Sequence, residues 1–132
     1  MNWIQWPALI TWLTAILLVA LGFNVGQARG RYGVKAPATT GNEQFERIYR
    51  AHMNTLENAV VFLPVLWLAA WYWKPALAAA CGAVWLVGRA WYAHAYARNP
   101  AGRAGGFNLA SLAFIVLLVS AAVGWVRALT TA

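Results

Sequence analysis

The segment Phe107–Trp125 reads FNLASLAFIVLLVSAAVGW and contains no charged residue. A helix needs about 20 mainly apolar residues to cross the hydrocarbon core of a bilayer. Three further segments meet this requirement, Trp3–Phe23, Tyr49–Trp73 and Pro75–Tyr96. Because runs this long satisfy their backbone hydrogen bonds in lipid as helices, the sequence predicts an all-α membrane protein. We expect residues 1–132 to form a single membrane domain, a bundle of these four transmembrane helices.

The composition also indicates a membrane protein. Hydrophobic residues make up 62% of the 132 residues and charged residues 10%, whereas a soluble domain carries about 25% charged residues. The formal net charge is +7, and the acids are Glu43, Glu46 and Glu57. The basic residues flank apolar segments and form no basic face, so no nucleic-acid partner is expected. The single cysteine, Cys81, excludes an intrachain disulfide and is interpreted as a packed thiol.

Basic residues are distributed unequally between the two ends of the predicted bundle. The two long connections, about Asn24–Ile48 and Ala97–Gly106, contain or adjoin Arg29, Arg31, Lys35, Arg47, Arg50, Arg98 and Arg103. The tight turn at Trp73–Pro75 and the C-terminal segment contribute only Lys74 and Arg127. The positive-inside rule therefore predicts that both long loops are cytoplasmic and that both termini lie on the opposite side.

The first apolar segment is interpreted as a retained span rather than a signal peptide. The residues before it carry no positive charge, and Trp3–Phe23 is longer than a typical signal-peptide core. The short loops and the lack of sorting motifs favour a bacterial protein, and therefore a bacterial inner membrane.

Polar residues interrupt the first half of the second span at helical spacing. Arg50, Asn54 and Glu57 are separated by four and three residues, so they share one helix face. A glutamate inside a span is costly unless it is paired or faces a polar cavity. Arg50 and Glu57 lie roughly 10 Å apart along the axis, so Asn54 or a bound ligand would have to bridge them.

The third span presents a matching polar face. Arg89, Tyr92 and Tyr96 follow one another at helical spacing, and Arg103 directly precedes the fourth span, whose N-terminus adds partial positive charge. The two faces together suit a small zwitterion with several carboxylates, because guanidinium groups bind carboxylates and Glu57 can accept an ammonium group. The alternative is a buried ion network that fixes helix packing, with the tyrosines as interface anchors. No metal site is predicted, because neither His52 nor His94 has a second ligand at metal spacing.

These residues also resemble a known signature. The two motifs are Glu46-Arg47-x-x-Arg50-Ala51-His52-x-Asn54-x-x-Glu57-Asn58 and Arg89-x-x-Tyr92-x-x-x-Tyr96, followed by Arg103. Together they resemble the membrane-associated proteins in eicosanoid and glutathione metabolism, the MAPEG family, and most closely its microsomal glutathione transferase branch. The resemblance implies a homotrimer with glutathione bound between neighbouring subunits at the cytosolic face.

The resemblance also implies individual roles. Glutathione would be held by Arg50, Asn54, Glu57, Asn58, Arg89, Tyr92 and Tyr96. Arg103 matches the arginine that stabilises the glutathione thiolate, while Arg29 and His52 fall where the adjacent subunit contributes. Two positions depart from the leukotriene-synthase branch. Asn58 replaces a tyrosine, and Gly30 follows Arg29 where that branch has adjacent arginines. These departures favour a general detoxifying transferase over a specialised eicosanoid synthase.

The function predicted on this basis is a membrane-bound glutathione transferase or glutathione-dependent peroxidase. It would activate glutathione as a thiolate and act on apolar electrophiles or lipid hydroperoxides that arrive from the membrane. One alternative is a non-catalytic, lipid-binding scaffold of the same fold. Another is a small four-span exporter with Glu57 as a proton-coupled site, which is disfavoured because the first span contains no acid.

Overall fold

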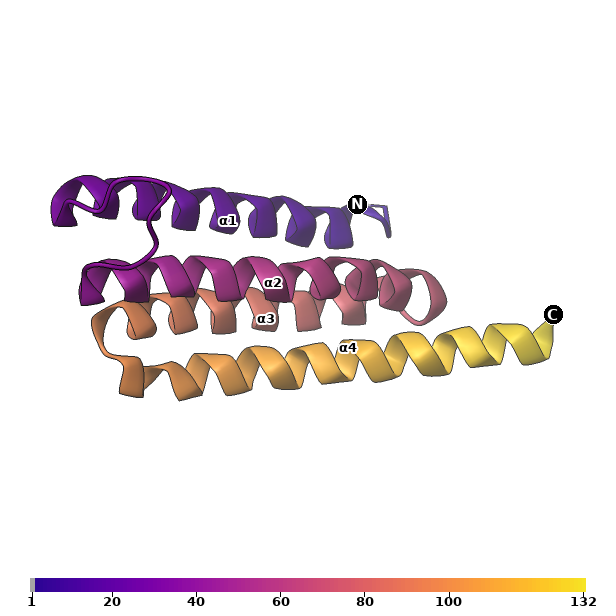
Figure 1. Cartoon of the computed structure of the whole chain (residues 1–132). Coiled ribbons are helices and arrows are strands. Elements are labelled where there is room, and N and C mark those ends of the chain that lie inside the picture. Colours follow the sequence, from indigo (N-terminus) through magenta and orange to yellow (C-terminus); the bar gives the residue numbers. More distant parts are fainter. Residues whose placement is uncertain (1) are drawn as a thin grey trace.

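The computed structural model describes residues 2–132 and consists of four long helices and one short one (Figure 1). The long helices are α1 (Gln5–Tyr32), α2 (Glu43–Tyr72), α3 (Pro75–Arg98) and α4 (Ala104–Thr131), and the 3-10 helix η1 (Pro100–Arg103) precedes α4. The α1–α2 and α3–α4 connections lie at one end of the bundle, and the α2–α3 turn and both termini lie toward the other. The predicted all-helical bundle is confirmed, and the described residues contain no strand.

The outside of the bundle is strongly apolar. Each of the four long helical segments is long and apolar enough to cross a membrane. Large apolar side chains point outward from α1, where Trp12, Val19 and Phe23 are each about 70% exposed. A surface of this kind is unfavourable in water and favourable against lipid. The apolar surface and the lengths of the four helices are therefore those of a multi-pass integral membrane protein.

The first long connection is shorter than the sequence predicts. α1 continues to Tyr32 and α2 begins at Glu43, so the loop is not Asn24–Ile48 but residues 33–42. Gly33 closes α1 with a φ of 67°, which glycine adopts without strain. Asn42 caps α2 by accepting a 3.0 Å hydrogen bond from the backbone N–H of Phe45. The polar residues on either side are thus helix ends that extend beyond the apolar segments.

The other two connections are compact. α2 ends at Tyr72 and α3 begins at Pro75, which confirms the predicted tight turn. The expected loop Ala97–Gly106 is instead mostly helical, because α3 runs to Arg98 and η1 leads directly into α4. Asn99 stabilises η1, since its side chain accepts a 3.1 Å hydrogen bond from the backbone N–H of Ala101. Arg103 consequently lies at the N-cap of α4, as predicted.

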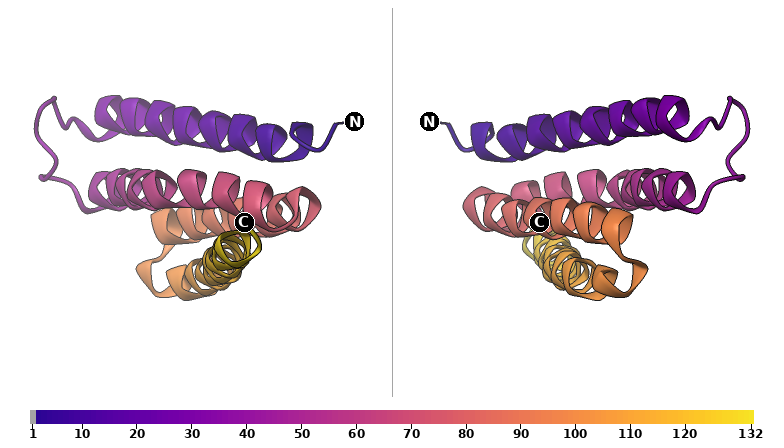
Figure 2. Two further views of the ribbon diagram at one scale, coloured as in Figure 1. Left: turned by 90° about the vertical axis from the view of Figure 1, so that its right-hand side faces the viewer. Right: turned by 90° about the vertical axis from the view of Figure 1, so that its left-hand side faces the viewer.

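Helices α3 and α4 pack closely at two glycines near this end of the bundle. A Cβ atom on Gly106 would lie 2.4 Å from the Tyr92 backbone nitrogen and 2.6 Å from the Gly88 carbonyl oxygen. Small residues allow membrane helices to approach in this way. Two further views show α1 alongside α2 and α4 inclined to the other helices (Figure 2). The α3–α4 contact places the start of α4 next to Tyr92.

The centre of the bundle is filled by aromatic and aliphatic side chains. The rings of Phe62 on α2 and Trp85 on α3 are fully buried and stack with a centroid distance of 3.8 Å. Leu66 and Leu117 complete the same core cluster. α1 is joined to α2 by a 3.1 Å hydrogen bond from Trp67 Nε1 to Thr11 Oγ1. Polar groups of the candidate site therefore lie at one end of a packed apolar core.

Candidate functional site

Two polar hollows lie at the loop end of the bundle and share one residue, Asn54. The first, which we call the loop hollow, has a volume of about 240 Å³ and is lined by Thr39, Thr40, Glu46, Tyr49, Arg50, Met53, Asn54 and Glu57. The second, the α4 hollow, has a volume of about 390 Å³ and is lined by Asn54, Tyr92, Arg103, Ala104, Phe107 and Asn108. The sequence-predicted residues are thus divided between two adjacent spaces.

The loop hollow carries charges of both signs. Arg50 and Glu57 lie about two turns apart on α2 and are both exposed. Among the described residues, neither of them forms an ion pair. Arg47, by contrast, pairs with Glu43, which lies one turn earlier on α2. The guanidinium and carboxylate in this hollow are therefore available to a ligand that carries opposite charges. Arg50, Asn54 and Glu57 all line this hollow, as their helical spacing on one face predicts.

In the α4 hollow an amide, a phenol and a guanidinium come together. Asn54 Nδ2 donates a 2.7 Å hydrogen bond to the hydroxyl oxygen of Tyr92, which is 4% exposed. The Arg103 guanidinium carbon lies 5.4 Å from the centroid of the Tyr96 ring, and that ring stacks on Tyr92 with a centroid distance of 5.7 Å. Because Arg103 is at the N-terminus of α4, its charge adds to the positive end of the helix dipole. An anion is favoured here.

Arg89 was predicted to contact the ligand, but it lies behind the site. Its side chain is 1% exposed and lines neither hollow. Its Nη2 donates a 2.9 Å hydrogen bond to Thr55 Oγ1, and its guanidinium carbon lies 4.1 Å from the centroid of the Tyr92 ring. Arg89 therefore contacts the site through Tyr92.

Four other predicted residues also lie outside the linings of the two hollows. Tyr96 is buried beneath Arg103, and Asn58 is half-buried on α2. Arg29 donates from Nη1 to the Ala38 carbonyl oxygen at 2.7 Å and so holds the α1–α2 loop. His52 faces α1 of its own chain, where a Cβ atom on Gly22 would lie 3.6 Å from the imidazole. Of the ten predicted residues, the hollows bring together Arg50, Asn54, Glu57, Tyr92 and Arg103.

Several residues of the linings were not predicted from the sequence. Thr39 and Thr40 belong to the loop, where nothing in the sequence distinguishes them from other polar loop residues. Phe107 and Asn108 lie within the first two turns of α4 and belong to the predicted apolar span Phe107–Trp125. An amide in the first turn of an otherwise apolar segment is the signal that could have identified Asn108. The described residues contain no cluster of three metal-ligating side chains.

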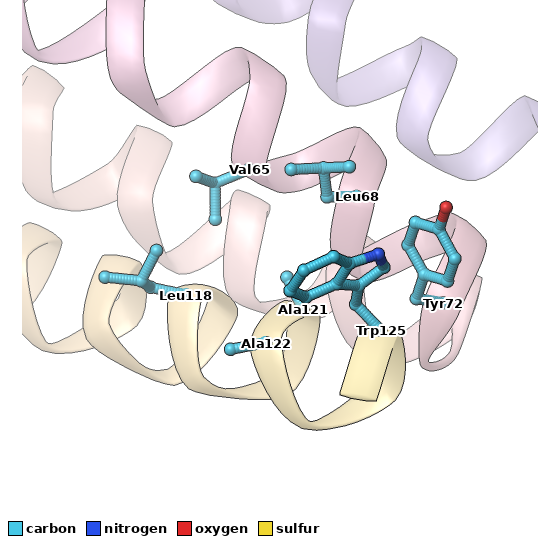
Figure 3. A pocket seen from close by; sticks show the side chains of 7 residues that line it. All are labelled: Val65, Leu68, Tyr72, Leu118, Ala121, Ala122 and Trp125. Atoms are coloured by element: carbon cyan, nitrogen blue, oxygen red, sulfur yellow. The ribbon is translucent and has the colours of Figure 1, made fainter. Parts of the chain in front are cut away.

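Apolar hollows lie toward the opposite end of the bundle. One, of about 290 Å³, is formed between α2 and α4 and is lined by Val65, Leu68, Tyr72, Leu118, Ala121, Ala122 and Trp125 (Figure 3). Its nearest α4 residue, Leu118, is roughly 22 Å along the helix axis from Arg103. This hollow has few polar groups and is separate from the polar site.

The bundle and its polar end define a membrane protein with an anion-accepting site. The chain belongs to the MAPEG family, which matches residues 7–123, so the resemblance found in the sequence motifs is confirmed. A Synechocystis protein described as uncharacterized is 53% identical over 116 residues, covering 88% of this chain and 85% of that protein. Human microsomal glutathione S-transferase 2 is 37% identical over 111 residues, 84% of this chain and 75% of the relative. Bovine leukotriene C4 synthase is 37% identical over 117 residues, 89% and 78% of the two chains.

Proposed function

We propose that this protein is a membrane-bound glutathione transferase that also acts as a glutathione-dependent peroxidase. The observation that carries the proposal is the pair of polar hollows that meet at Asn54. One hollow offers a guanidinium and a carboxylate, and the other offers Tyr92 and Arg103 at a helix N-terminus. Relatives named microsomal glutathione S-transferase 2 and leukotriene C4 synthase support glutathione as the co-substrate.

The chemistry of glutathione fits this division. Glutathione carries two carboxylates, one ammonium group and one thiol. Its charged groups would bind in the loop hollow, where Arg50 pairs with a carboxylate and Glu57 with the ammonium group. Asn54 would contact the middle of the tripeptide, and the thiol would enter the α4 hollow beside Arg103.

Arg103 would activate the thiol electrostatically. The thiolate, and not the thiol, is the nucleophile, and a nearby cation favours the ionised form. The proton leaves to solvent, and the thiolate sulfur attacks an electrophilic carbon to form a carbon–sulfur bond. At the same time the bond from that carbon to its leaving group, or the π bond of a conjugated acceptor, breaks, and the displaced electron pair leaves with the leaving group or takes up a proton from solvent. With a lipid hydroperoxide, the thiolate attacks the distal oxygen, the oxygen–oxygen bond breaks and the alcohol leaves. A second glutathione then converts the sulfenic acid into a disulfide and water.

The second substrate would arrive from the membrane. The α4 hollow is bounded by Ala104 and the exposed ring of Phe107, which continue into the apolar outer surface of α4. An apolar electrophile partitioned into lipid can therefore approach Arg103 without crossing water. This supports a general detoxifying role, because the lining selects mainly for apolarity.

We infer that the working unit is a homotrimer whose sites face the cytosol. Arg29 and His52 line neither hollow of their own chain, so their proposed role is at a neighbouring subunit's glutathione. The basic residues that the positive-inside rule assigns to the cytoplasm lie in the two connections near the site and in the helix ends beside them. Light scattering of the detergent-solubilised protein tests the trimer, and accessibility of Thr39→Cys to an impermeant reagent in oriented vesicles tests the side.

An ultraviolet difference titration with glutathione tests the function, since the thiolate absorbs where the thiol does not. Detergent-solubilised wild type, Arg103→Ala and the control Arg98→Ala are compared, because Arg98 is exposed and lines neither hollow. We expect a saturable thiolate signal in wild type and in the control, and its loss in Arg103→Ala. Absence of both the signal and calorimetric binding in wild type would reject the proposal in favour of a lipid-binding scaffold.

A further inference from the structure

Arg89 is a buried cation without an acidic partner among residues 2–132. It is 1% exposed, and its Nη2 donates a 2.9 Å hydrogen bond to Thr55 Oγ1. Its Nε is buried and has no hydrogen-bond partner. A guanidinium in a membrane-spanning bundle is unfavourable unless its charge interacts with another group. The group that interacts with the Arg89 charge in this position is Tyr92.

That contact is the face of the Tyr92 ring. The Arg89 guanidinium carbon lies 4.1 Å from the ring centroid, well within the range of a cation–π interaction. Burial of both side chains strengthens the interaction, because water does not screen it. A cation on the ring face withdraws electron density from the phenol, so it makes the hydroxyl a stronger hydrogen-bond donor.

The Tyr92 hydroxyl has its proton available for this purpose. Asn54 Nδ2 donates to the hydroxyl oxygen at 2.7 Å, so the phenol accepts one hydrogen bond from α2. Its own O–H can then donate to an acceptor in the α4 hollow, which Tyr92 lines. Thr55, the acceptor for Arg89, is the neighbour of Asn54 in the chain. Two hydrogen bonds and one cation–π contact thus connect neighbouring residues of α2, Asn54 and Thr55, with Tyr92 and Arg89 of α3.

We propose that Arg89 is a positioning residue that orients Tyr92 and strengthens its O–H as a donor to bound glutathione. Arg89 itself does not touch glutathione. This inference rests on the proposed function, because it concerns the same ligand in the same hollow. It also accounts for a cation that is buried behind the site and lines neither hollow.

A double-mutant cycle tests the coupling. The variants are Arg89→Met, Tyr92→Phe and the double variant, with Arg98→Met as a matched control on the same helix. The readout is the pH dependence of the thiolate absorbance of bound glutathione, together with calorimetric affinity. We expect Arg89→Met and Tyr92→Phe each to reduce the thiolate-to-thiol ratio about tenfold, because the first weakens and the second removes the hydrogen bond that the Tyr92 O–H would donate to the thiolate. The double variant should lose no more than either single variant.

Several outcomes would overturn the inference while leaving the proposed function intact. One is a wild-type thiolate signal that Arg89→Met does not change. Another is an equal loss from Arg89→Met in the wild-type and Tyr92→Phe backgrounds, which would indicate a general packing role. Absence of glutathione binding in wild type would instead reject the proposed function, and this inference with it.

Two further variants separate positioning from loss of folding. Arg89→Lys keeps the charge and should recover part of the thiolate signal that Arg89→Met loses. Thr55→Val removes the acceptor of the Arg89 hydrogen bond at nearly constant volume. It should therefore also reduce the thiolate signal, as Arg89→Met does. If Arg89→Met does not fold, an unchanged signal in folded Thr55→Val would still count against the inference.

Discussion

The amide nitrogen of Asn54 donates a 2.7 Å hydrogen bond to the hydroxyl oxygen of Tyr92, and this bond joins α2 to α3 at the loop end of the bundle. Asn54 is also the one residue that lines both polar hollows. The same side chain thus fixes the phenol on one side and borders the charged pair Arg50 and Glu57 on the other. A ligand that spans the hollows has to pass Asn54.

Replacing Asn54 should therefore weaken glutathione binding in both hollows. Asn54→Leu keeps the approximate size of the side chain but removes its donor and acceptor. We expect glutathione affinity to fall about 10- to 100-fold, the usual value of a hydrogen bond to a charged group. Calorimetric titration measures this change. Asn24→Leu, an exposed position on α1, is the matched control, and equal affinities for Asn54→Leu and this control would contradict the prediction.

Glu57→Gln should selectively weaken recognition of the glutathione ammonium group. The substitution removes the negative charge from the loop hollow and changes the shape very little. We expect glutathione affinity to fall about tenfold, because a charge-assisted hydrogen bond becomes a neutral one. An analogue without the amino group should bind wild type and Glu57→Gln equally well.

The control for this change is Glu43→Gln, which removes an exposed carboxylate that pairs with Arg47 and lines neither hollow. If the amino-free analogue also bound Glu57→Gln more weakly, Glu57 would act on another part of the ligand. Proton-driven transport that disappears in Glu57→Gln would support the exporter alternative instead.

The bundle could be predicted from the sequence because each span is a long apolar run with turn residues at its ends. The ends of α1 and α2 could not, because polar residues on a helix beyond the bilayer resemble those of a loop. Asn42 and Gly33 are the residues that place these ends, through a cap and a positive φ. They are recognised as caps once the helix boundaries are known.

The site was predictable where a single helix carries it. Spacing along α2 places Arg50, Asn54 and Glu57 on one face, and all three line the loop hollow. Spacing gives the direction of a side chain around its helix, but not its depth in the bundle. Arg89 shares the face of Tyr92, but only Tyr92 lines the α4 hollow, because the Arg89 guanidinium reaches Thr55 on α2. That depth depends on how the helices pack against one another, and the periodicity of one helix gives no information about this packing.

Asn108 should influence which second substrate is accepted. It is the amide of the α4 hollow that comes from α4 itself, beside the apolar ring of Phe107. Asn108→Leu should leave glutathione affinity within about twofold, and should favour purely apolar electrophiles over those with a hydroxyl near the reacting carbon. We expect the ratio of kcat/KM values for such a pair to change about tenfold, the value of a single hydrogen bond to substrate. An unchanged ratio would show that Asn108 does not contact the second substrate.

Gly106→Ala should destabilise the protein by separating α3 from α4. The added methyl group would lie 2.4 Å from the Tyr92 backbone nitrogen and 2.6 Å from the Gly88 carbonyl oxygen. Both of these are backbone atoms, so they cannot turn away as a side chain would. Overpacking of this kind typically costs about 1–3 kcal/mol. Thermal unfolding in detergent, followed by circular dichroism, should therefore show a lower Tm than wild type.

The matched control for this change is Gly26→Ala, because Gly26 is also helical and a Cβ atom there would meet nothing within 4 Å. Alanine is the better helix former by about 1 kcal/mol, so Gly26→Ala should keep or raise the Tm. The glutathione thiolate signal should also fall in folded Gly106→Ala, because the clash lies at Tyr92 and moves the start of α4, which carries Arg103. A lower Tm with an unchanged thiolate signal would mean that the α3–α4 contact stabilises the bundle without setting the position of Arg103.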